Sequence, residues 1–320
     1  MNLVTANSES IQHAAQIIKS GGLVAFPTET VYGLGADGLN PIAVAKIFEA
    51  KKRPTFNPLI LHIAEKNWFT KLASSIDENV ELLIEKFMPG PLTLVLPKKD
   101  IVPDIVTSGN STVAIRMPNH LVALELIKEA GTPIAAPSAN KFGHLSPTEA
   151  IHVQKYLGSK VDLIIDGGKC SVGIESTIIQ YEEGNFYLLR HGGISKEDLE
   201  KITGKFSNKK LDADKPNSPG QLPFHYSPNT PLKFYDESLL DESKNIGALF
   251  FREKTDNFNY KIERVLSPSG NLREAAANLF LILHEFETLD LDLILVEKIE
   301  QSGLGSAIMD RLTKAVNKHY

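Results

Sequence analysis

Short apolar runs typical of buried strands alternate with helical patterns through the first part of this 320-residue chain, over about 200 residues. The run at residues 21–26 ends at Pro27, which cannot donate to a strand ladder. A loop with polar residues and two glycines is predicted to follow it, over residues 27–37. The segment 133–140 repeats this order of apolar run, proline and polar side chains. The alternation predicts an α/β domain. A hairpin-like pair at 176–181 and 186–190 predicts that its sheet is mixed rather than purely parallel.

The composition changes after residue 204, where Lys, Asn, Asp, Ser and Pro become frequent. We therefore predict a domain over 1–204, a linker over 205–231 and a smaller α/β domain over 232–320. Residues 221–228 (QLPFHYSP) are too aromatic for a passive linker. In the smaller domain the patterns predict strands at 246–251 and 293–296 and helices at 271–285 and 306–317.

The overall charge and the cysteine content exclude some classes of protein. A net charge of −5 gives no general attraction to nucleic acid or anionic membranes, so any RNA contact must come from a local patch. Cys170 is the one cysteine, so no intramolecular disulfide forms, which fits a reducing compartment. We find no signal-peptide pattern and no apolar run long enough to cross a membrane. A cytoplasmic location with no membrane contact is expected.

Several familiar motifs fail on inspection. Residues 33–38 have the glycine spacing of a dinucleotide site, but a polar loop separates them from the preceding strand and no acidic residue follows at the expected distance. A phosphate-loop sequence is absent, and His284 has no second histidine at zinc-helix spacing. We predict no metal site made by the protein's own side chains.

A scattered polar set survives these exclusions. Lys51 and Arg53 lie at a helix end against Pro54, where they suit a polyphosphate or simply the helix dipole. Arg116 ends a strand and suits a carboxylate or phosphate, or a surface salt bridge. Ser146 has the spacing of a helix N-cap. The other members are residues 137–140, 173–177 and 190–192. By pattern alone, this set predicts an α/β enzyme that acts on an anionic substrate. Arg53 is predicted to be exposed to solvent.

The combination of motifs resembles the YrdC family. The resemblance rests on residues 27–34 (PTETVYGL), 51–54 (KKRP), 57–59 (NPL), 137–140 (PSAN), 173–178 (GIESTI) and 189–192 (LRHG). Residues 219–228 (PGQLPFHYSP) and 303–312 (GLGSAIMDRL) are similar to the longer, two-domain members. The resemblance covers nearly the whole chain and implies a twisted, open α/β sheet with a positively charged concavity.

The implied activity is that of an L-threonylcarbamoyladenylate synthase. Members of the family use L-threonine, bicarbonate or CO₂, and ATP to make threonylcarbamoyl-AMP and pyrophosphate for the modification of tRNA. The threonine amine captures CO₂, and the carbamate oxygen attacks the α-phosphate. Positioning and charge neutralisation dominate such a reaction, which accounts for the absence of a nucleophilic triad. A segment that closes over the site would keep water from the labile carbamate.

By resemblance, the threonine site should contain Arg116 on the carboxylate with Thr30, His62, the Ala136 backbone and Ser176 around it. The ATP site should contain the catalytic pair Lys51 and Arg53, with Asn57, Thr112, Ser138, Asn140, Ser146 and Arg190, and with Tyr226 closing over the nucleotide. Mg²⁺ should arrive on the phosphates. Proteins that transfer the product to tRNA are the expected partners, with at most weak contact to tRNA itself. The alternatives are an RNA- or tRNA-binding module without chemistry, and a related carbamoyl transferase.

Overall fold

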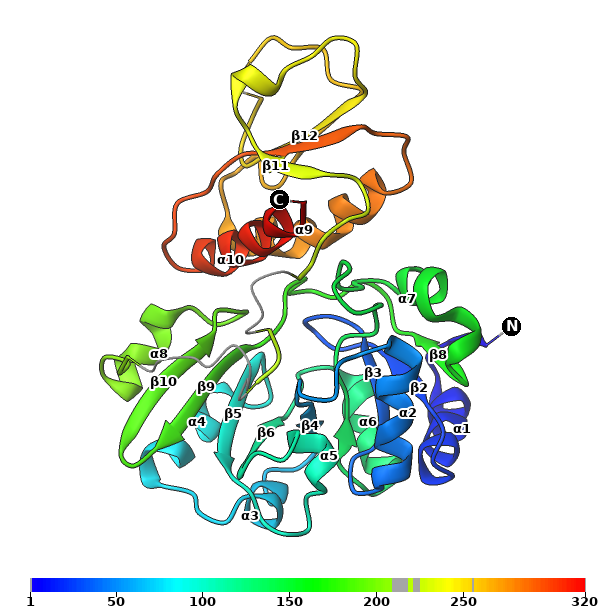
Figure 1. The fold of residues 1–320 in the computed structure, drawn as a ribbon. Coiled ribbons are helices and arrows are strands. Elements are labelled where there is room, and N and C mark those ends of the chain that lie inside the picture. The colour runs from blue at the N-terminus through cyan, green and yellow to red at the C-terminus, as the bar shows by residue number, and fades with distance from the viewer. Residues whose placement is uncertain (1, 209–217, 221–224, 255, 320) are drawn as a thin grey trace.

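The computed structural model describes residues 2–208, 218–220, 225–254 and 256–319. Two sheets organise the chain, a mixed sheet of ten strands and a parallel sheet of four (Figure 1). This mixed α/β architecture with a second, smaller sheet confirms the predicted fold class. Among the described residues, none of the helices combines the length and the apolar composition that crossing a bilayer requires.

The large sheet places strands from distant parts of the chain side by side. Parallel pairs join β1 to β8, β8 to β2, β4 to β6 and β5 to β9, and the other neighbours are antiparallel. In spatial order the strands are β1 (Leu3–Thr5), β8 (Leu163–Asp166), β2 (Val24–Phe26), β3 (Gly33–Asp37), β7 (Ile134–Ala135), β4 (Ile60–His62), β6 (Thr112–Arg116), β5 (Leu92–Pro97), β9 (Thr177–Glu182) and β10 (Asn185–Arg190).

Helices cover both faces of this sheet. The alternation of side chains along β2 shows the two faces. Val24 and Phe26 belong to the same apolar cluster as residues of α1 and α6, whereas Ala25 belongs to the cluster that includes α2, α4 and α7. The helices of this part are α1 (Ser8–Lys19), α2 (Pro41–Lys51), α3 (Trp68–Leu72), α4 (Glu78–Phe87), α5 (Asp104–Thr107), α6 (Leu121–Ala130), α7 (Ala150–Leu157) and α8 (Lys196–Thr203), with the 3₁₀ turn η1 (Gly158–Lys160).

The small sheet has the order β11 (Leu232–Phe234), β14 (Leu293–Val296), β12 (Ile246–Phe250) and β13 (Ile262–Val265). Its helices are α9 (Leu272–Phe286) and α10 (Gly305–Val316), with 3₁₀ turns η2 (Glu237–Leu239) and η3 (Asn317–His319). Figure 1 shows α9 and α10 between the small sheet and the rest of the molecule. Their apolar core also takes in Val31, Leu145 and Ile174 from the first part of the chain, so the two parts share buried surface.

Close backbone contact accompanies this shared core. Gly173 has φ +73°, and a Cβ built on it would lie 2.5 Å from the Cα of Ala277 in α9. The positive φ favours glycine, and the small distance admits no side chain. The segment before β9 is therefore held directly against a helix of the C-terminal part.

Two local expectations are wrong. Residues 33–37 form strand β3 rather than a loop, and glycine fits there because a Cβ on Gly35 would lie 2.7 Å from Cε1 of Phe26. The helix expected to start at Ser146 begins at Ala150, with Glu149 as its N-cap residue. The Ser146 hydroxyl instead donates to a carboxylate of the pocket described next.

Candidate active site

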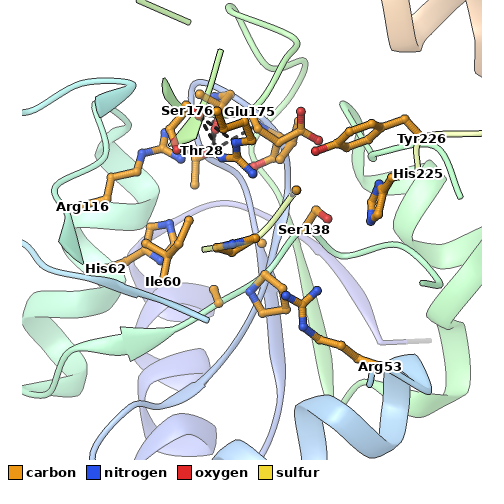
Figure 2. Close-up of a pocket in the computed structure, with 18 residues that line it drawn as sticks. Thr28, Arg53, Ile60, His62, Arg116, Ser138, Glu175, Ser176, His225 and Tyr226 are labelled. Carbon is orange, nitrogen blue, oxygen red and sulfur yellow. Dashed lines mark hydrogen bonds between the residues drawn. The ribbon is translucent and has the colours of Figure 1, made fainter. Parts of the chain in front are cut away.

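A pocket lies where several strand ends meet beneath the C-terminal part of the chain (Figure 2). Its empty space, which includes some open solvent, is about 560 Å³. Figure 2 shows charged side chains entering it from different sides, with Arg116 and Arg53 far apart on its rim. The described lining residues are Thr28, Thr30, Val31, Gly33, Arg53, Ile60, His62, Arg116, Ala136, Pro137, Ser138, Glu175, Ser176, Arg190, Pro219, Gly220, His225 and Tyr226.

Strand pairing brings these residues together. β4 and β6 run parallel with His62 opposite Arg116, so both side chains reach the same edge of the pocket. The chain leaving β7 runs antiparallel to β4, and the Ala136 amide donates to the Ile60 carbonyl over 2.9 Å. Arg190 is the last residue of β10 and pairs with Ile178 of β9. The long turn after β2 adds the residues from Thr28 onward.

Lys51 lies behind the pocket wall rather than on its surface. Its buried ammonium donates to the Ser138 carbonyl over 2.6 Å and also to the carbonyl and side-chain oxygen of Asn140. Burial, followed by the charge of Arg53, lowers the pKa of Lys51. Lys51 therefore fixes the backbone of the segment 138–140 from below.

Arg53 is buried, and the expectation that it would be exposed is wrong. Its Nε donates to the Asn57 carbonyl over 3.0 Å and its Nη2 to the Pro58 carbonyl over 2.9 Å. Backbone acceptors hold the guanidinium, and no carboxylate among the described residues forms an ion pair with it. Burial lowers the pKa of Arg53 to about 9, with the charge of Arg190 acting in the same direction. A buried cation without a counter-ion makes this side of the pocket suited to an anion.

Arg116 forms a buried ion pair with Glu29, with 2.7 Å between Nη2 and Oε2, so the surface salt bridge considered from the sequence is wrong. Neighbouring His62 is 4 % exposed. Burial and then the charge of Arg116 lower the pKa of His62 to about 3, so the imidazole is neutral at ordinary pH. This edge of the pocket therefore combines one paired guanidinium with an uncharged ring.

Arg190 grips the segment before β9. Its Nε and Nη2 donate to the Ser176 carbonyl over 3.0 and 2.9 Å, and Nη2 also lies 3.1 Å from the Ser176 hydroxyl. That hydroxyl is in turn hydrogen-bonded to the Thr93 hydroxyl over 2.7 Å. Burial lowers the pKa of Arg190. The result is a second buried guanidinium fixed by oxygen atoms at the pocket wall.

Glu175 lines the pocket. It belongs to the predicted polar segment 173–177, but it was not assigned to the threonine or the ATP site. One of its oxygens accepts from Arg311 Nε over 2.9 Å, and the other accepts from the Ser146 hydroxyl. Burial alone would raise the pKa of Glu175, but the charges of Arg311 and Arg190 lower it. The sequence signals that point to this pair are the motif around Ser176 and the tail motif around Arg311.

Tyr226 covers the pocket opposite Ser138 (Figure 2). It has φ +63°, which is rare for a large side chain and is maintained by its packing. Its ring centroid lies 4.1 Å from that of His225 and 5.8 Å from that of Phe280 in α9. Burial, followed by Glu175, raises the pKa of Tyr226 to about 12. The phenol is therefore neutral and held by the C-terminal part of the chain.

Two family models together match almost the whole chain. Residues 16–192 match the model described as telomere recombination, which groups Sua5, YciO and YrdC proteins. Residues 194–316 match the model described as the C-terminal domain of threonylcarbamoyl-AMP synthase. The chain belongs to the Sua5/YciO/YrdC family. The resemblance found from the sequence motifs is confirmed.

Relatives in this family match at full length. Threonylcarbamoyl-AMP synthase of Pyrococcus abyssi is 43 % identical, over 95 % of this chain and 93 % of its own. The Bacillus subtilis threonylcarbamoyl-AMP synthase is 41 % identical, over 98 % and 94 %. The crystal structure of P. abyssi Sua5 complexed with L-threonine superposes with a TM-score of 0.90 at 41 % identity, covering 99 % and 97 %. E. coli YciO, at 21 % identity and a TM-score of 0.52, shares the fold over 59 % of this chain.

Most of the residues predicted from the family motifs line the pocket. Those on the lining are Thr30, Arg53, His62, Arg116, Ala136, Ser138, Ser176, Arg190 and Tyr226. Four others lie one contact behind the lining. Lys51 and Asn140 are hydrogen-bonded to Ser138, Asn57 to Arg53, and Ser146 to Glu175. Thr112 lies at the opposite end of β6 from Arg116 and pairs with Pro97. Residues 221–224 of the aromatic linker motif are outside the described residues.

The described part of the chain contains no group of three or more His, Cys, Asp or Glu residues arranged to hold a metal ion. The buried carboxylates Glu29 and Glu175 are each paired with an arginine, Arg116 and Arg311 respectively.

Proposed function

We propose that this protein makes L-threonylcarbamoyl-AMP and pyrophosphate from L-threonine, bicarbonate or CO₂, and ATP. The observation that carries the proposal is the convergence of Arg53, Arg116 and Arg190 on one pocket. Two of these guanidiniums have no carboxylate ion pair among the described residues, so a polyanion is the natural ligand. Full-length relatives that are threonylcarbamoyl-AMP synthases, and a solved structure of one with L-threonine, support the same reaction.

The edge around Arg116 is proposed to hold threonine. Its guanidinium shares its charge with Glu29, and a substrate carboxylate would become a second acceptor for its N–H groups. His62 is neutral, so its imidazole does not repel the amino group. Thr30, Ser176 and the Ala136 backbone complete a small polar wall on the same lining. The free amine attacks CO₂ and loses a proton, which forms the carbamate.

The side around Arg53, Ser138 and Arg190 is proposed to hold ATP. The carbamate oxygen forms a bond to the α-phosphorus as the bond from that phosphorus to the leaving pyrophosphate breaks. Buried guanidiniums stabilise the charge that accumulates on the leaving oxygens. Lys51 keeps the Ser138 carbonyl and Asn140 in place, so it supports Arg53 from behind. Asn57, Thr112 and Ser146 stay predicted as further ATP residues. Mg²⁺ is proposed to enter with the phosphates and to supply added charge neutralisation.

The parts of the chain are proposed to divide this work. Residues 1–204 would form the catalytic domain, 232–320 the C-terminal domain, and 205–231 a linker whose Tyr226 covers the nucleotide. Of that linker, 209–217 and 221–224 lie outside the described residues. The product would pass to proteins that modify tRNA, in the cytoplasm, with at most weak contact between this protein and tRNA. Cell fractionation and co-purification test these two statements.

Product identification by mass spectrometry tests the reaction. Incubation with ATP, L-threonine and bicarbonate should give threonylcarbamoyl-AMP and pyrophosphate, and omission of any one substrate should abolish both. Equal pyrophosphate release with other amino acids would contradict the proposal. Consumption of carbamoyl phosphate in place of ATP and threonine would indicate a carbamoyl transferase. Salt-sensitive tRNA binding without any ATP binding would indicate an RNA-binding module.

Arg53→Met tests the phosphate side of the pocket. We expect kcat/KM for ATP to fall by about 100-fold or more, since a preorganised charge next to the leaving group is lost. Pyrophosphate should raise the Tm of the wild type, and this rise should vanish in the variant. Arg273→Met, which removes an arginine outside the lining, is the matched control and should behave as the wild type. Unchanged ATP kinetics in Arg53→Met would remove Arg53 from the site.

A further inference from the structure

Glu175 places a negative charge where the proposed function needs positive charge. It is the one carboxylate among the described lining residues, and its neighbour Ser176 is bonded to Arg190. Glu175 is 5 % exposed, so water screens its charge weakly. An unpaired carboxylate at this position would repel the phosphates of ATP.

The counter-charge comes from the other end of the chain. Arg311 in α10 is 1 % exposed and donates from Nε to Glu175 over 2.9 Å. Its Nη1 donates to the His191 carbonyl and to Asp310, each over 2.7 Å. The guanidinium also lies 5.1 Å from the ring centroid of Tyr226, which covers the pocket. One side chain of the C-terminal part thus contacts three segments of the site.

Stability alone does not account for this arrangement. A buried ion pair adds little net stability compared with apolar residues of the same size, because both charges lose their hydration. The apolar core around α9 and α10, which includes Ile174 next to Glu175, already holds the two parts together. We therefore look for a role of the Arg311–Glu175 ion pair in the pocket itself.

We propose that Arg311 is a positioning residue that neutralises Glu175, so that Arg190 keeps its place on Ser176 and remains available to a phosphate. This inference rests on the proposed function, because it assigns the phosphates to the side of the pocket around Arg190. Without Arg311, the nearest remaining guanidinium to balance Glu175 is that of Arg190. Its attraction to the carboxylate would remove charge from the substrate.

The test measures the Kd of ATP with Mg²⁺ by calorimetry, without threonine. Arg311→Met should raise this Kd by about tenfold or more, as expected when one partner of a buried charge pair is removed. The double variant Arg311→Met/Glu175→Gln, which removes both charges, should recover most of the lost affinity. Arg264→Met, in an exposed ion pair with Glu285 of the same C-terminal part, is the matched control and should bind ATP as the wild type does.

A pH series separates charge compensation from a structural role. The charged or titratable groups facing Glu175 are Arg311 and Asp310 from α10, Arg190 at the end of β10, and Tyr226. In Arg311→Met, burial is no longer offset by Arg311 and raises the pKa of Glu175. Acidification should then protonate this carboxyl and restore ATP affinity. The double variant has glutamine there and should lack this recovery.

Arg311→Gln replaces Arg311→Met if the latter does not fold, because its amide can still bond the His191 carbonyl. Wild-type ATP affinity in a folded, neutral Arg311 variant would overturn the inference, as would a loss that Glu175→Gln does not relieve. In both cases a wild type that still makes threonylcarbamoyl-AMP leaves the proposed function intact. A wild type that makes no such product contradicts the proposed function instead.

Discussion

Gly192 packs against the backbone that carries the pocket residues of the segment before β9. A Cβ on Gly192 would lie 2.3 Å from both the carbonyl carbon of Ser176 and the amide nitrogen of Thr177, and 2.4 Å from the Glu175 carbonyl oxygen. These are backbone atoms, which cannot rotate away as a side chain can. The glycine therefore sets the distance between the end of β10 and the start of β9.

Gly192→Ala should move Glu175 and Ser176. We expect overpacking to lower the free energy of unfolding by about 1–3 kcal/mol and the displacement to reduce kcat/KM by about tenfold or more. Urea unfolding and the product assay measure the two effects. Gly184→Ala in the β9–β10 turn is the control, since it has φ +78° with no atom within 4 Å of the added Cβ. It should cost stability only, and wild-type activity in Gly192→Ala would contradict the argument.

At the scale of residues, the sequence predicted which side chains lie in the pocket better than it predicted their burial and their partners. Motifs singled out Arg53 and Arg116, because cations next to prolines at strand and helix ends are conspicuous. Their burial could not be predicted, since it depends on segments that pack over them from elsewhere in the chain. Glu175 lies in the predicted polar segment 173–177, but no role was assigned to it, because its partner Arg311 is 136 residues away.

Helix α2 places Lys51 behind the pocket wall and leads into Arg53, which lines the pocket. The Asn40 side chain caps its first turn by accepting from the amides of Ile42 over 3.0 Å and Ala43 over 3.2 Å. The helix ends at Lys52 in the left-handed region, with φ 51°, and this turn carries Arg53 toward the pocket. The cap stabilises one end of the helix while the functional residues lie at the other.

Asn40→Ala should lower the free energy of unfolding by about 1 kcal/mol, because two amides of the first turn lose their acceptor. Activity should be unchanged at temperatures where the variant is folded. Denaturant unfolding measures the loss, and Asn40→Ser, which keeps a capping oxygen, should recover most of it. A loss of activity without a loss of stability would show that α2 is not the rigid support described here.

The sequence predicted most of the strands and helices around the pocket but missed β3. Glycines at positions 33 and 35 weaken any strand pattern, so a loop was the natural interpretation. The strand forms because Phe26 fills the space above those glycines, which is a tertiary contact rather than a local preference. The short strands β1, β11 and β13 were missed because each has three or four residues, two of them apolar, and so carries little periodic signal.

At the scale of the whole molecule, buried histidines join the two parts of the chain. His152 of α7 and His284 of α9 stack with ring centroids 3.8 Å apart. Burial, then the charge of Lys155, lowers the pKa of His152 to about 4. Burial, then His152, lowers the pKa of His284 to about 3. Both rings are therefore neutral in the folded protein and charged in the acid-unfolded chain.

Stability should fall as pH drops below the unfolded histidine pKa of about 6.5, since the unfolded chain then binds more protons than the folded one. Each such histidine contributes a slope of about 1.4 kcal/mol per pH unit, and the loss continues until the pH reaches the folded-state pKa. His152→Phe should remove about one such slope between pH ~4 and ~6.5. Urea unfolding across this range measures it. Exposed His13→Phe is the control, and an unchanged slope in His152→Phe would contradict the prediction.

The sequence predicted two structured parts and a stretch of different composition between them, but not how the parts meet. Ile174 and Phe280 belong to one core although they lie in different parts of the chain. No periodicity within either segment records that contact. The same holds for the histidine stack, which pattern analysis had considered only as an incomplete zinc helix.

Arg311 and Glu175 are separated by 136 positions. Glu175 is therefore synthesised well before the arginine that pairs with it. A nascent chain that has passed Arg190 has every strand of the large sheet, yet Glu175 has no partner from α10 and must stay hydrated. Completion of the nucleotide site is therefore a late event of biosynthesis. If the proposed ATP site is correct, chains that stop before α10 are expected to bind ATP poorly, because Glu175 then lacks Arg311.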